Sequence, residues 1–315
     1  MKQLSPEACN QARNFLKTQA RALDRALYEH RFEEAPVRTV MAALSTYQNE
    51  DGGFGRALEA DLRTPTSSAL ATGHGLSLLK ELNCQPSHPA VSRAIQYLLD
   101  SFEQEAQVWR VVPRDTNDYP RAPWWHDDGT SLAQTFDNYV IIPRAQILGL
   151  LWHFSGAAPK ALSIGWLEEV TERTVSEIES LPGLGSGGGD DLAYTLDLLE
   201  TEALPDQFQD RLASRIREVV PAAVSRKPEE WGSYCIVPLK LAPSPRSFAA
   251  SLIWDGVQAH LDYQIGHQTP EGSWDPTWTW SEWYPEAWSQ AKLEWRGHLT
   301  LETLTSLQAY GRIQK

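Results

Sequence analysis

Hydrophobic residues recur at helical spacing along most of the chain. The stretches 37–47 and 91–102 each place an apolar residue every three or four positions. One-sided stripes of this kind are typical of helices that bury one face. Further helices are expected at about 8–28, 67–82, 131–154, 159–181, 190–202, 206–224, 250–268 and 286–310. Because strand patterns are few, the sequence predicts an all-α protein, with Pro143 interrupting the helix around it.

Two turns that follow predicted helices share one sequence pattern. Gln48 and Gln268 are each followed by a Gly and then by an aromatic residue, Phe54 or Trp274, at the same spacing. Gly permits the left-handed backbone that ends a helix, and the Gln amide is placed to bond backbone groups of the next helix. Weaker echoes lie at 104–109 and 229–232. We therefore expect helical hairpins joined by a repeated turn, in a single domain over residues 1–315.

These turns resemble the QW-type repeats of the terpenoid cyclase and protein prenyltransferase superfamily, which includes bacterial proteins built on this repeat. The resemblance implies an α/α toroid of about six helical hairpins over essentially the whole chain. The acid motifs DxDD and DDxxD of terpenoid cyclases are absent. Cys235 and His298 match two of the zinc ligands of protein prenyltransferases, but Ser233 stands where that family has Asp. The resemblance therefore supports the fold more strongly than an activity.

Composition narrows the classes of partner. The chain has 28 Lys and Arg against 41 Asp and Glu, a net charge of −13, which disfavours binding to nucleic acid or an anionic membrane. The first residues lack the apolar core of a signal peptide, and no apolar run is long enough for a membrane span. Three scattered cysteines indicate a reducing, cytoplasmic location. No cofactor or metal is expected, and the oligomeric state stays open.

The loop after the first repeated turn carries the candidate catalytic acids. Glu59 and Asp61 lie just before a predicted helix, and Arg63 follows as a candidate substrate anchor. A carboxyl group in a poorly hydrated cavity can have a raised pKa and donate a proton. The alternative is a solvated loop in which Arg63 pairs with a carboxylate.

A second loop combines aromatic and acidic residues. Trp124, Trp125 and His126 are candidate binding residues, and Asp128 is a third candidate acid. Indole faces stabilise a cation or stack on a sugar ring. His126 and Asp128 alone are too few ligands for a metal site. The alternative is a loop held in place by buried Trp side chains.

The C-terminal third is rich in Trp and carries the remaining candidates for substrate binding. They are Trp278, Trp280, Glu294, Trp295, Arg296 and His298. Glu294 and His298 are four residues apart and therefore share one face of a helix. If the loops 55–66, 119–130 and 275–285 meet at one end of a ring, they bring seven candidates to one cavity: Glu59, Asp61, Trp124, Trp125, Asp128, Trp278 and Trp280. The alternative for the helix is a solvated face on which Arg296 pairs with a carboxylate.

Three functions fit these patterns. The leading hypothesis is a terpenoid-cyclase-like or prenyl-handling enzyme that holds a small apolar or isoprenoid ligand in an acidic, Trp-lined cavity. The alternative is a carbohydrate-active enzyme, a glycosidase or a lyase, since Trp faces and paired carboxylates also suit a sugar. The third is a non-catalytic toroid that binds an apolar ligand.

Overall fold

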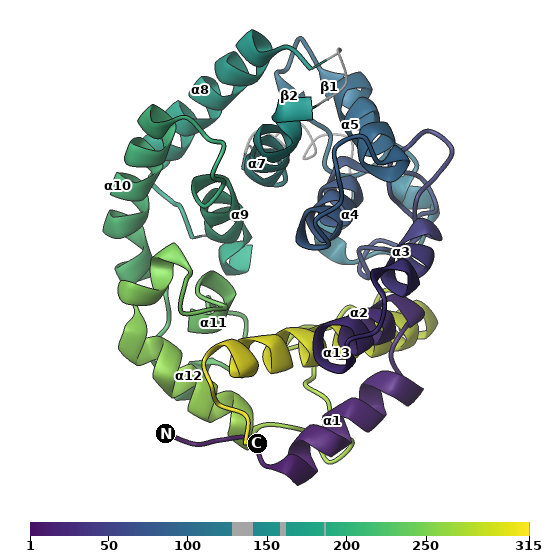
Figure 1. Cartoon of the computed structure of the whole chain (residues 1–315), viewed down its shortest axis with the longest axis vertical. Coiled ribbons are helices and arrows are strands. Elements are labelled where there is room, and N and C mark those ends of the chain that lie inside the picture. The colour runs from purple at the N-terminus through teal and green to yellow at the C-terminus, as the bar shows by residue number, and fades with distance from the viewer. Residues whose placement is uncertain (128–140, 158–161, 186, 315) are drawn as a thin grey trace. The chain divides into compact units, whose positions relative to one another are not determined.

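The computed structural model describes residues 1–127, 141–157, 162–185 and 187–314, and this part of the chain is mainly helical (Figure 1). The all-α prediction is confirmed. Within the described residues the strands are limited to β1 (Phe102–Glu103) and β2 (Val108–Trp109), which form one antiparallel hairpin. Asp128 and the first ten residues of the helix expected over 131–154 lie outside the described ranges.

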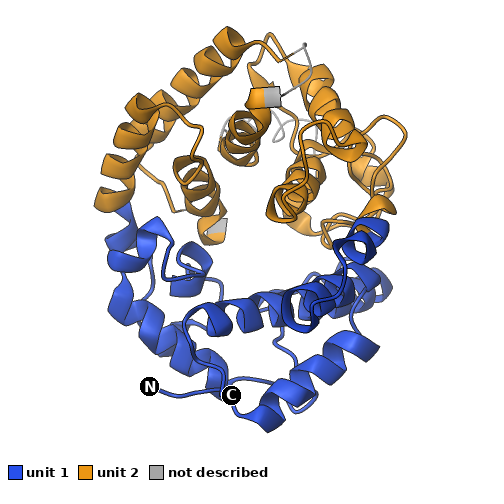
Figure 2. Cartoon of the chain, viewed as in Figure 1, with its two compact units in different colours: residues 1–43, 219–315 blue, residues 44–218 orange. Residues whose placement is uncertain are grey.

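The chain divides into two compact units, which Figure 2 colours separately. Unit 1 comprises residues 1–43 and 219–315, and unit 2 comprises residues 44–218. The helices of unit 2 are α4 (Ala69–Glu81), α5 (Pro89–Ser101), α7 (Arg144–Phe154), α8 (Ile164–Ser180) and α9 (Asp190–Leu199). Those of unit 1 are α1 (Pro6–Thr18), α2 (Ala22–Glu33), α11 (Pro238–Leu241), α12 (Trp254–Gly266) and α13 (Pro285–Ala309). The helices α3 (Val37–Ser45) and α10 (Asp206–Ala223) contain the boundary residues.

Helix α7 forms the centre of unit 2. Nearly all its side chains are buried, and it packs against α4, α8 and α9. Its sequence, RAQILGLLWHF, is apolar on all sides, as expected for a helix surrounded by others. Helix α7 begins directly after Pro143, because proline lacks the amide hydrogen that an earlier helical turn would need. The polar residues Arg144 and Gln146 within this buried helix therefore require partners inside the unit.

Unit 1 is built around α13, which packs against α1 and α2. Gly297 makes this close approach possible, because a β-carbon at this position would lie 2.9 Å from the β-carbon of Ala20. The helix expected over 8–28 is interrupted at residues 19–21, where the chain turns beside Gly297. The chain termini also meet here, since Leu4 pairs with Ile313 in a parallel bridge.

The two repeated turns have the same geometry, as the sequence predicts. Gly52 and Gly272 adopt φ values of +93° and +92°. Gln48 donates hydrogen bonds of 2.9 Å to the carbonyls of Gly52 and Ala90, and Gln268 bonds Gly272 and Ala8 equally. Each Gln thus ties its own turn to the start of another helix, α5 or α1.

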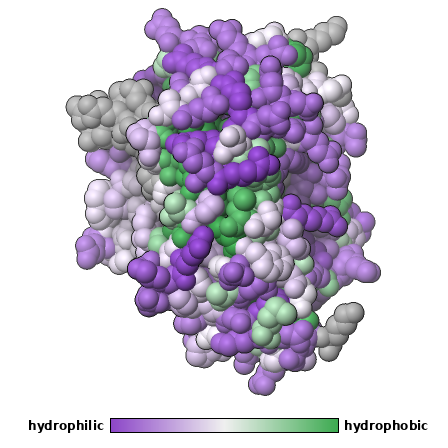
Figure 3. Space-filling model, turned by 90° about the vertical axis from the view of Figure 1, so that its left-hand side faces the viewer, coloured by the Kyte–Doolittle hydropathy of each residue, from purple (hydrophilic) through white to green (hydrophobic). Residues whose placement is uncertain are grey.

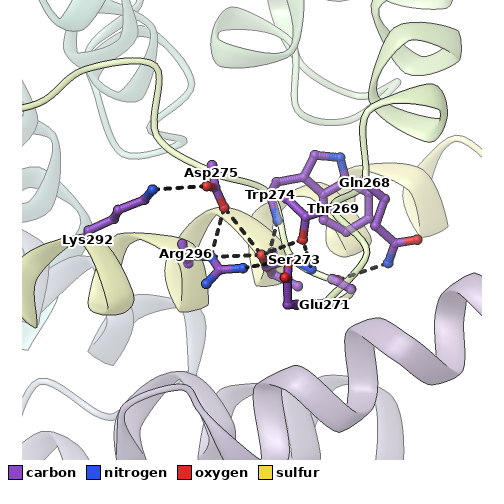
Figure 4. Close-up of polar contacts among 10 residues, drawn as sticks. Gln268, Thr269, Glu271, Ser273, Trp274, Asp275, Lys292 and Arg296 are labelled. Carbon is purple, nitrogen blue, oxygen red and sulfur yellow. Dashed lines mark hydrogen bonds and ion pairs between the residues drawn. The ribbon is translucent and has the colours of Figure 1, made fainter. Parts of the chain in front are cut away.

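Figure 4 shows how the second turn is fixed to α13. The guanidinium of Arg296 donates to Ser273 at 2.9 Å and pairs with Asp275 at 2.8 Å. It also stacks over the ring of Phe15 at 4.9 Å. Lys292 pairs with Asp275 at 3.3 Å. These contacts explain why two cations on α13 lie beside an acidic turn.

The weaker echoes of the repeat keep only part of this geometry. Over 104–109 the chain forms the β1–β2 hairpin, with Gln107 at φ 59° instead of a glycine. The indole of Trp109 still donates to the carbonyl of Leu98 at 2.7 Å, and that of Trp274 to Gln264 at 2.9 Å. The aromatic residue of the pattern is therefore retained where the Gln bridge is lost.

The surface and the helix lengths complete the description. The face drawn in Figure 3 is mainly hydrophilic, with apolar surface only in patches. Among the described residues, no helix is both long and apolar enough to cross a bilayer.

Candidate functional site

Five polar side chains of unit 2 gather at α4, α7 and α9. We call them the polar cluster: Glu59, His74, Gln146, Tyr194 and Asp197. Glu59 precedes α4, His74 lies on α4, Gln146 lies on α7, and the other two lie one helical turn apart on α9. The polar cluster thus combines two carboxyl groups, an imidazole, an amide and a phenol, which can transfer protons or form hydrogen bonds.

A line of three groups crosses the polar cluster from Glu59 to Tyr194. One carboxylate oxygen of Glu59 lies 3.7 Å from Nδ1 of His74, and Nε2 of His74 lies 3.1 Å from the Tyr194 hydroxyl. Glu59 is buried, whereas the His74 side chain keeps 29% of its surface exposed. Burial, followed by the charges of Asp190, Glu59 and Asp197, raises the pKa of Tyr194 well above its usual value. Tyr194 therefore remains a neutral phenol.

The second part of the polar cluster is the pair of Gln146 and Asp197. The Gln146 amide donates a 2.9 Å hydrogen bond to the Asp197 carboxylate. Burial raises the pKa of Asp197, and this effect outweighs the opposing influence of that hydrogen bond and of the Lys80 charge. Solvent nevertheless reaches the Asp197 side chain. The Asp197 residue is thus exposed, while the protein atoms around its carboxyl group disfavour the charge. A carboxyl group that a ligand can reach and that resists ionisation is suited to give a proton to a small molecule.

The amide of Gln146 is held between two helices. Its oxygen is buried without a hydrogen-bond partner, while its nitrogen serves Asp197. A β-carbon at Gly73 on α4 would lie 2.8 Å from this oxygen. The absence of a side chain at Gly73 therefore lets α4 approach Gln146, and the amide has a fixed position.

Two of the loops with predicted site residues meet in unit 2. Leu62 and Arg121 pair in an antiparallel bridge, the amide of Ala122 donates to the carbonyl of Asp61 at 2.8 Å, and that of Arg63 to Pro120 at 3.1 Å. The structure thus brings together Asp61, Arg63 and the segment that follows Tyr119, although they are about sixty residues apart in sequence.

The predicted site residues of these loops have different environments. Asp61 is buried, and the Arg63 side chain donates to the carbonyl of Ala60 at 3.2 Å. Trp125 packs against the buried cluster of Leu62, Leu70, Val111 and Val112. Trp124 is exposed, and Nδ1 of His126 is bonded to the guanidinium of Arg121. Trp125 therefore anchors the loop, as in the structural alternative, and Trp124 faces solvent.

The aromatic candidates of unit 1 pack against one another. Trp278 meets Trp295 edge to face at 5.0 Å between ring centroids. Trp280 is 2% exposed and meets Trp288 at 5.3 Å. The two indoles of the 278–280 segment thus contact different partners instead of forming one flat surface.

The polar candidates of unit 1 are engaged within α13 and its turn. Glu294 is buried and accepts a 2.9 Å hydrogen bond from Gln290. His298 lies 3.3 Å from Glu302, four residues further along the same helix face. Arg296 pairs with Asp275 of the second repeated turn, which agrees with the alternative that Arg296 pairs with a carboxylate instead of binding substrate. These contacts stabilise the helix and leave unit 2 as the better place for a reaction.

Four members of the polar cluster are not predicted from the sequence. His74, Gln146, Tyr194 and Asp197 belong to no short motif, and their spacing in sequence is wide. One sequence feature could have indicated Gln146: it is a polar residue in the otherwise apolar helix α7. Such a residue must find a partner or a function inside the fold. Only Glu59 of the cluster followed from its place in a loop.

The site offers no obvious metal centre, and the comparisons offer no relative. Among the described residues, no three His, Cys, Asp or Glu side chains are grouped to hold a metal ion. Comparison of the chain with protein families, with characterised proteins and with solved structures gives no match. The functional argument therefore depends on the geometry of the polar cluster.

Proposed function

We propose that the chain is an enzyme whose acid–base site is the polar cluster of unit 2, and that its substrate is a small hydroxylated molecule such as a sugar. The observation that carries the proposal is Asp197, an accessible acid whose pKa is raised by burial and which is held by Gln146. Tyr194, on the same helix, supplies a second proton-transfer group bonded to His74.

The composition of the polar cluster favours a polar substrate over an isoprenoid. All its side chains carry hydrogen-bonding groups, and each such group loses free energy if an apolar ligand displaces water without replacing its bonds. The described aromatic pairs that involve Trp in unit 2 join Phe102, Trp109 and Trp166, and none of them includes a residue of the polar cluster. A hydroxylated ligand matches the available donors and acceptors, as in the carbohydrate-active alternative.

A ligand panel with matched variants tests the proposal. Wild-type protein is heated with aldoses, ketoses and sugar acids, and separately with geranyl and farnesyl diphosphate, while unfolding is monitored. We expect a hydroxylated ligand to raise the melting temperature of the wild type, and the Asp197→Asn variant to lose most of this increase. The Asp100→Asn variant, with the same change at an exposed position of α5, should keep the increase. Stabilisation by a prenyl diphosphate alone would favour the second candidate below.

The second candidate is the prenyl-handling enzyme on an α/α toroid. The support for the toroid is the repeated Gln–Gly–aromatic turn, which in the resembling superfamily joins the hairpins of a closed ring. The support for an isoprenoid ligand is the pair of Trp278 and Trp295, which are only partly buried and whose faces suit a carbocation. This function would use an acid to protonate the ligand, and it predicts binding of a prenyl diphosphate in the same panel.

A further inference from the structure

Tyr194 and Asp197 are a matched proton acceptor and proton donor on one helix. We infer that they act together to interconvert an α-hydroxy carbonyl compound, such as an open-chain sugar, with its enediol. The inference deepens the proposed function and rests on it. It assigns the site to isomerase-type or lyase-type chemistry and separates it from simple hydrolysis.

One hydrogen bond and one charge contact in the line from Glu59 to Tyr194 leave the phenol oxygen as an acceptor. The Glu59 carboxylate favours the His74 tautomer with its proton on Nδ1, 3.7 Å away. Nε2 of His74 then carries the lone pair and accepts the Tyr194 hydroxyl proton at 3.1 Å. The Tyr194 oxygen then keeps its lone pairs for a ligand, and Tyr194 as a residue is only partly buried.

Proton transfer through this line never creates a phenolate. The C–H bond beside the substrate carbonyl breaks, and its proton goes to the Tyr194 oxygen while the original hydroxyl proton moves to Nε2 of His74. The His74 ring becomes an imidazolium ion, which the Glu59 carboxylate stabilises. Tyr194 is neutral before and after the step, so an ionised phenol is not required. The effective base is the imidazole, and Tyr194 is the group that touches the substrate.

Asp197 completes the step at the neighbouring substrate atom. The electron pair of the broken C–H bond forms the carbon–carbon double bond, and the carbonyl oxygen takes the proton of the Asp197 carboxyl group. The product is a neutral enediol, with Asp197 ionised and His74 protonated. Reversal at the adjacent carbon returns both protons and yields the isomer, so no other reactant is consumed.

The spacing of the two groups suits one small substrate. Tyr194 and Asp197 are three residues apart on α9, which places their β-carbons about 5–6 Å apart on one helix face. The charge of Asp197 acts on Tyr194 at this separation, so one small ligand can contact both side chains. Gln146 fixes the position of the Asp197 carboxyl group through its 2.9 Å hydrogen bond. Acid and base therefore address adjacent atoms of one ligand and not two distant ones.

Exchange of substrate hydrogen with heavy water is the test. The protein is incubated with dihydroxyacetone, D-fructose or D-xylulose in D₂O, and deuterium at the carbon beside the carbonyl is measured by NMR. Binding of each compound is measured separately by the shift in melting temperature. We expect deuterium incorporation with the wild type, and a loss of about 10²–10⁴-fold in the Tyr194→Phe variant. The Tyr97→Phe variant, with the same change on α5, should exchange normally.

His74 is tested as a positioning residue by its pH profile. Because Gln cannot take up the Tyr194 proton, the His74→Gln variant should lose about 10²–10⁴-fold in exchange rate, and its residual exchange should no longer fall at acid pH, a change that a purely structural role would not produce. Binding of the sugars without deuterium exchange overturns the paired proton transfer and leaves the proposed site intact. If none of the compounds binds, both the inference and the hydroxylated-ligand site are contradicted. Equal exchange in wild type and Tyr194→Phe also contradicts the inference.

Discussion

Asp197 and His260 show opposite consequences of the same physical cause. Burial disfavours a charge, so it raises the pKa of the acid Asp197 and lowers that of the base His260 to about 3. His260 is 1% exposed, its Nδ1 atom is buried without a partner, and its ring contacts Trp231 and Tyr263. His260 is a packing residue of unit 1, whereas Asp197 is accessible to a ligand in unit 2.

His260 should make the folded protein sensitive to acid. The pKa of His260 is about 3 in the folded protein and 6.5 for an ordinary histidine, as in the unfolded chain. The unfolded chain therefore binds more protons between these two pH values. The stability is complete above pH 6.5 and declines as the pH falls toward 3, by at most about 1.4 kcal/mol per pH unit. Urea unfolding at pH 7, 6 and 5 measures the slope. A shallower slope in His260→Gln is expected, and equal slopes would exclude His260 as the cause.

For single residues, the sequence could indicate a candidate acid such as Glu59 but not the side chains that it contacts. Glu59 was predicted because it follows a repeated turn, and its contact with His74 depends on how α4 is placed. The environments of Asp197 and Tyr194 come from helices that are far apart in sequence. A raised pKa is a property of the surrounding atoms, so no pattern in α9 alone could reveal it.

The repeated turn is the element for which the sequence was most informative. The spacing of Gln, Gly and the aromatic residue predicts the left-handed Gly and a Gln bridge, and both are present at each turn. The bridges reach α5 and α1, however, and not the helix that follows each turn in the chain. One feature was not anticipated. Thr72 and Thr300 are buried in α4 and α13, and their hydroxyls accept hydrogen bonds from the amides of Phe54 and Trp274 at 2.9 and 3.1 Å. These Thr residues lie too far along the chain to be recognised as part of the turn.

Replacing the glycine of a repeated turn should be destabilising. A β-carbon at Gly52 would lie 2.5 Å from the carbonyl oxygen of Arg93, and one at Gly272 would lie 2.4 Å from the carbonyl carbon of Gln11. We expect Gly52→Ala and Gly272→Ala each to lower the free energy of unfolding by at least about 1–3 kcal/mol, through positive φ and the backbone clash. Gly183→Ala is the control, since its β-carbon meets nothing within 4 Å. Unfolding midpoints equal to the control would refute the steric argument.

The buried Thr residues provide a chemical test of the same element. Thr72→Val or Thr300→Val keeps the side-chain shape and leaves a buried amide without an acceptor, which should cost about 1–3 kcal/mol. Thr→Ser at either position keeps the hydroxyl and should retain the hydrogen bond. Chemical denaturation compares the three proteins. If Val and Ser variants lose equal stability, then packing of the methyl group is responsible and the hydrogen bond is not.

At the scale of the whole molecule, the helical class was predictable and the grouping of helices was not. The periodicity of apolar residues located most helices to within a few residues, since a one-sided stripe directly reflects burial. The sequence does not reveal the break between α1 and α2, because the periodic pattern continues through residues 19–21, where Gly297 of α13 leaves room for the turn. No Pro- or Gly-rich linker marks the boundaries of the two units after residues 43 and 218.

The purified protein should retain no stoichiometric zinc. The prenyltransferase ligand set is incomplete in the sequence, and the described residues form no group of three metal-binding side chains. Elemental analysis after dialysis against a weak chelator measures the metal content, with a zinc enzyme carried through the same procedure as the control. One zinc per chain that survives dialysis would refute this expectation and favour the prenyltransferase function.

A carbon-13 NMR titration of the Asp197 carboxyl group is the decisive experiment for the acid–base site. The proposed function requires the pKa of the Asp197 carboxyl group to lie above the ordinary aspartate value of 3.8. Labelled wild-type protein is titrated alongside Gln146→Leu, with Asp197→Asn to assign the signal. We expect a wild-type midpoint above 3.8, and a higher one in Gln146→Leu, because the Gln146 hydrogen bond lowers the pKa. A wild-type midpoint at or below 3.8 would contradict the role of Asp197 as the acid.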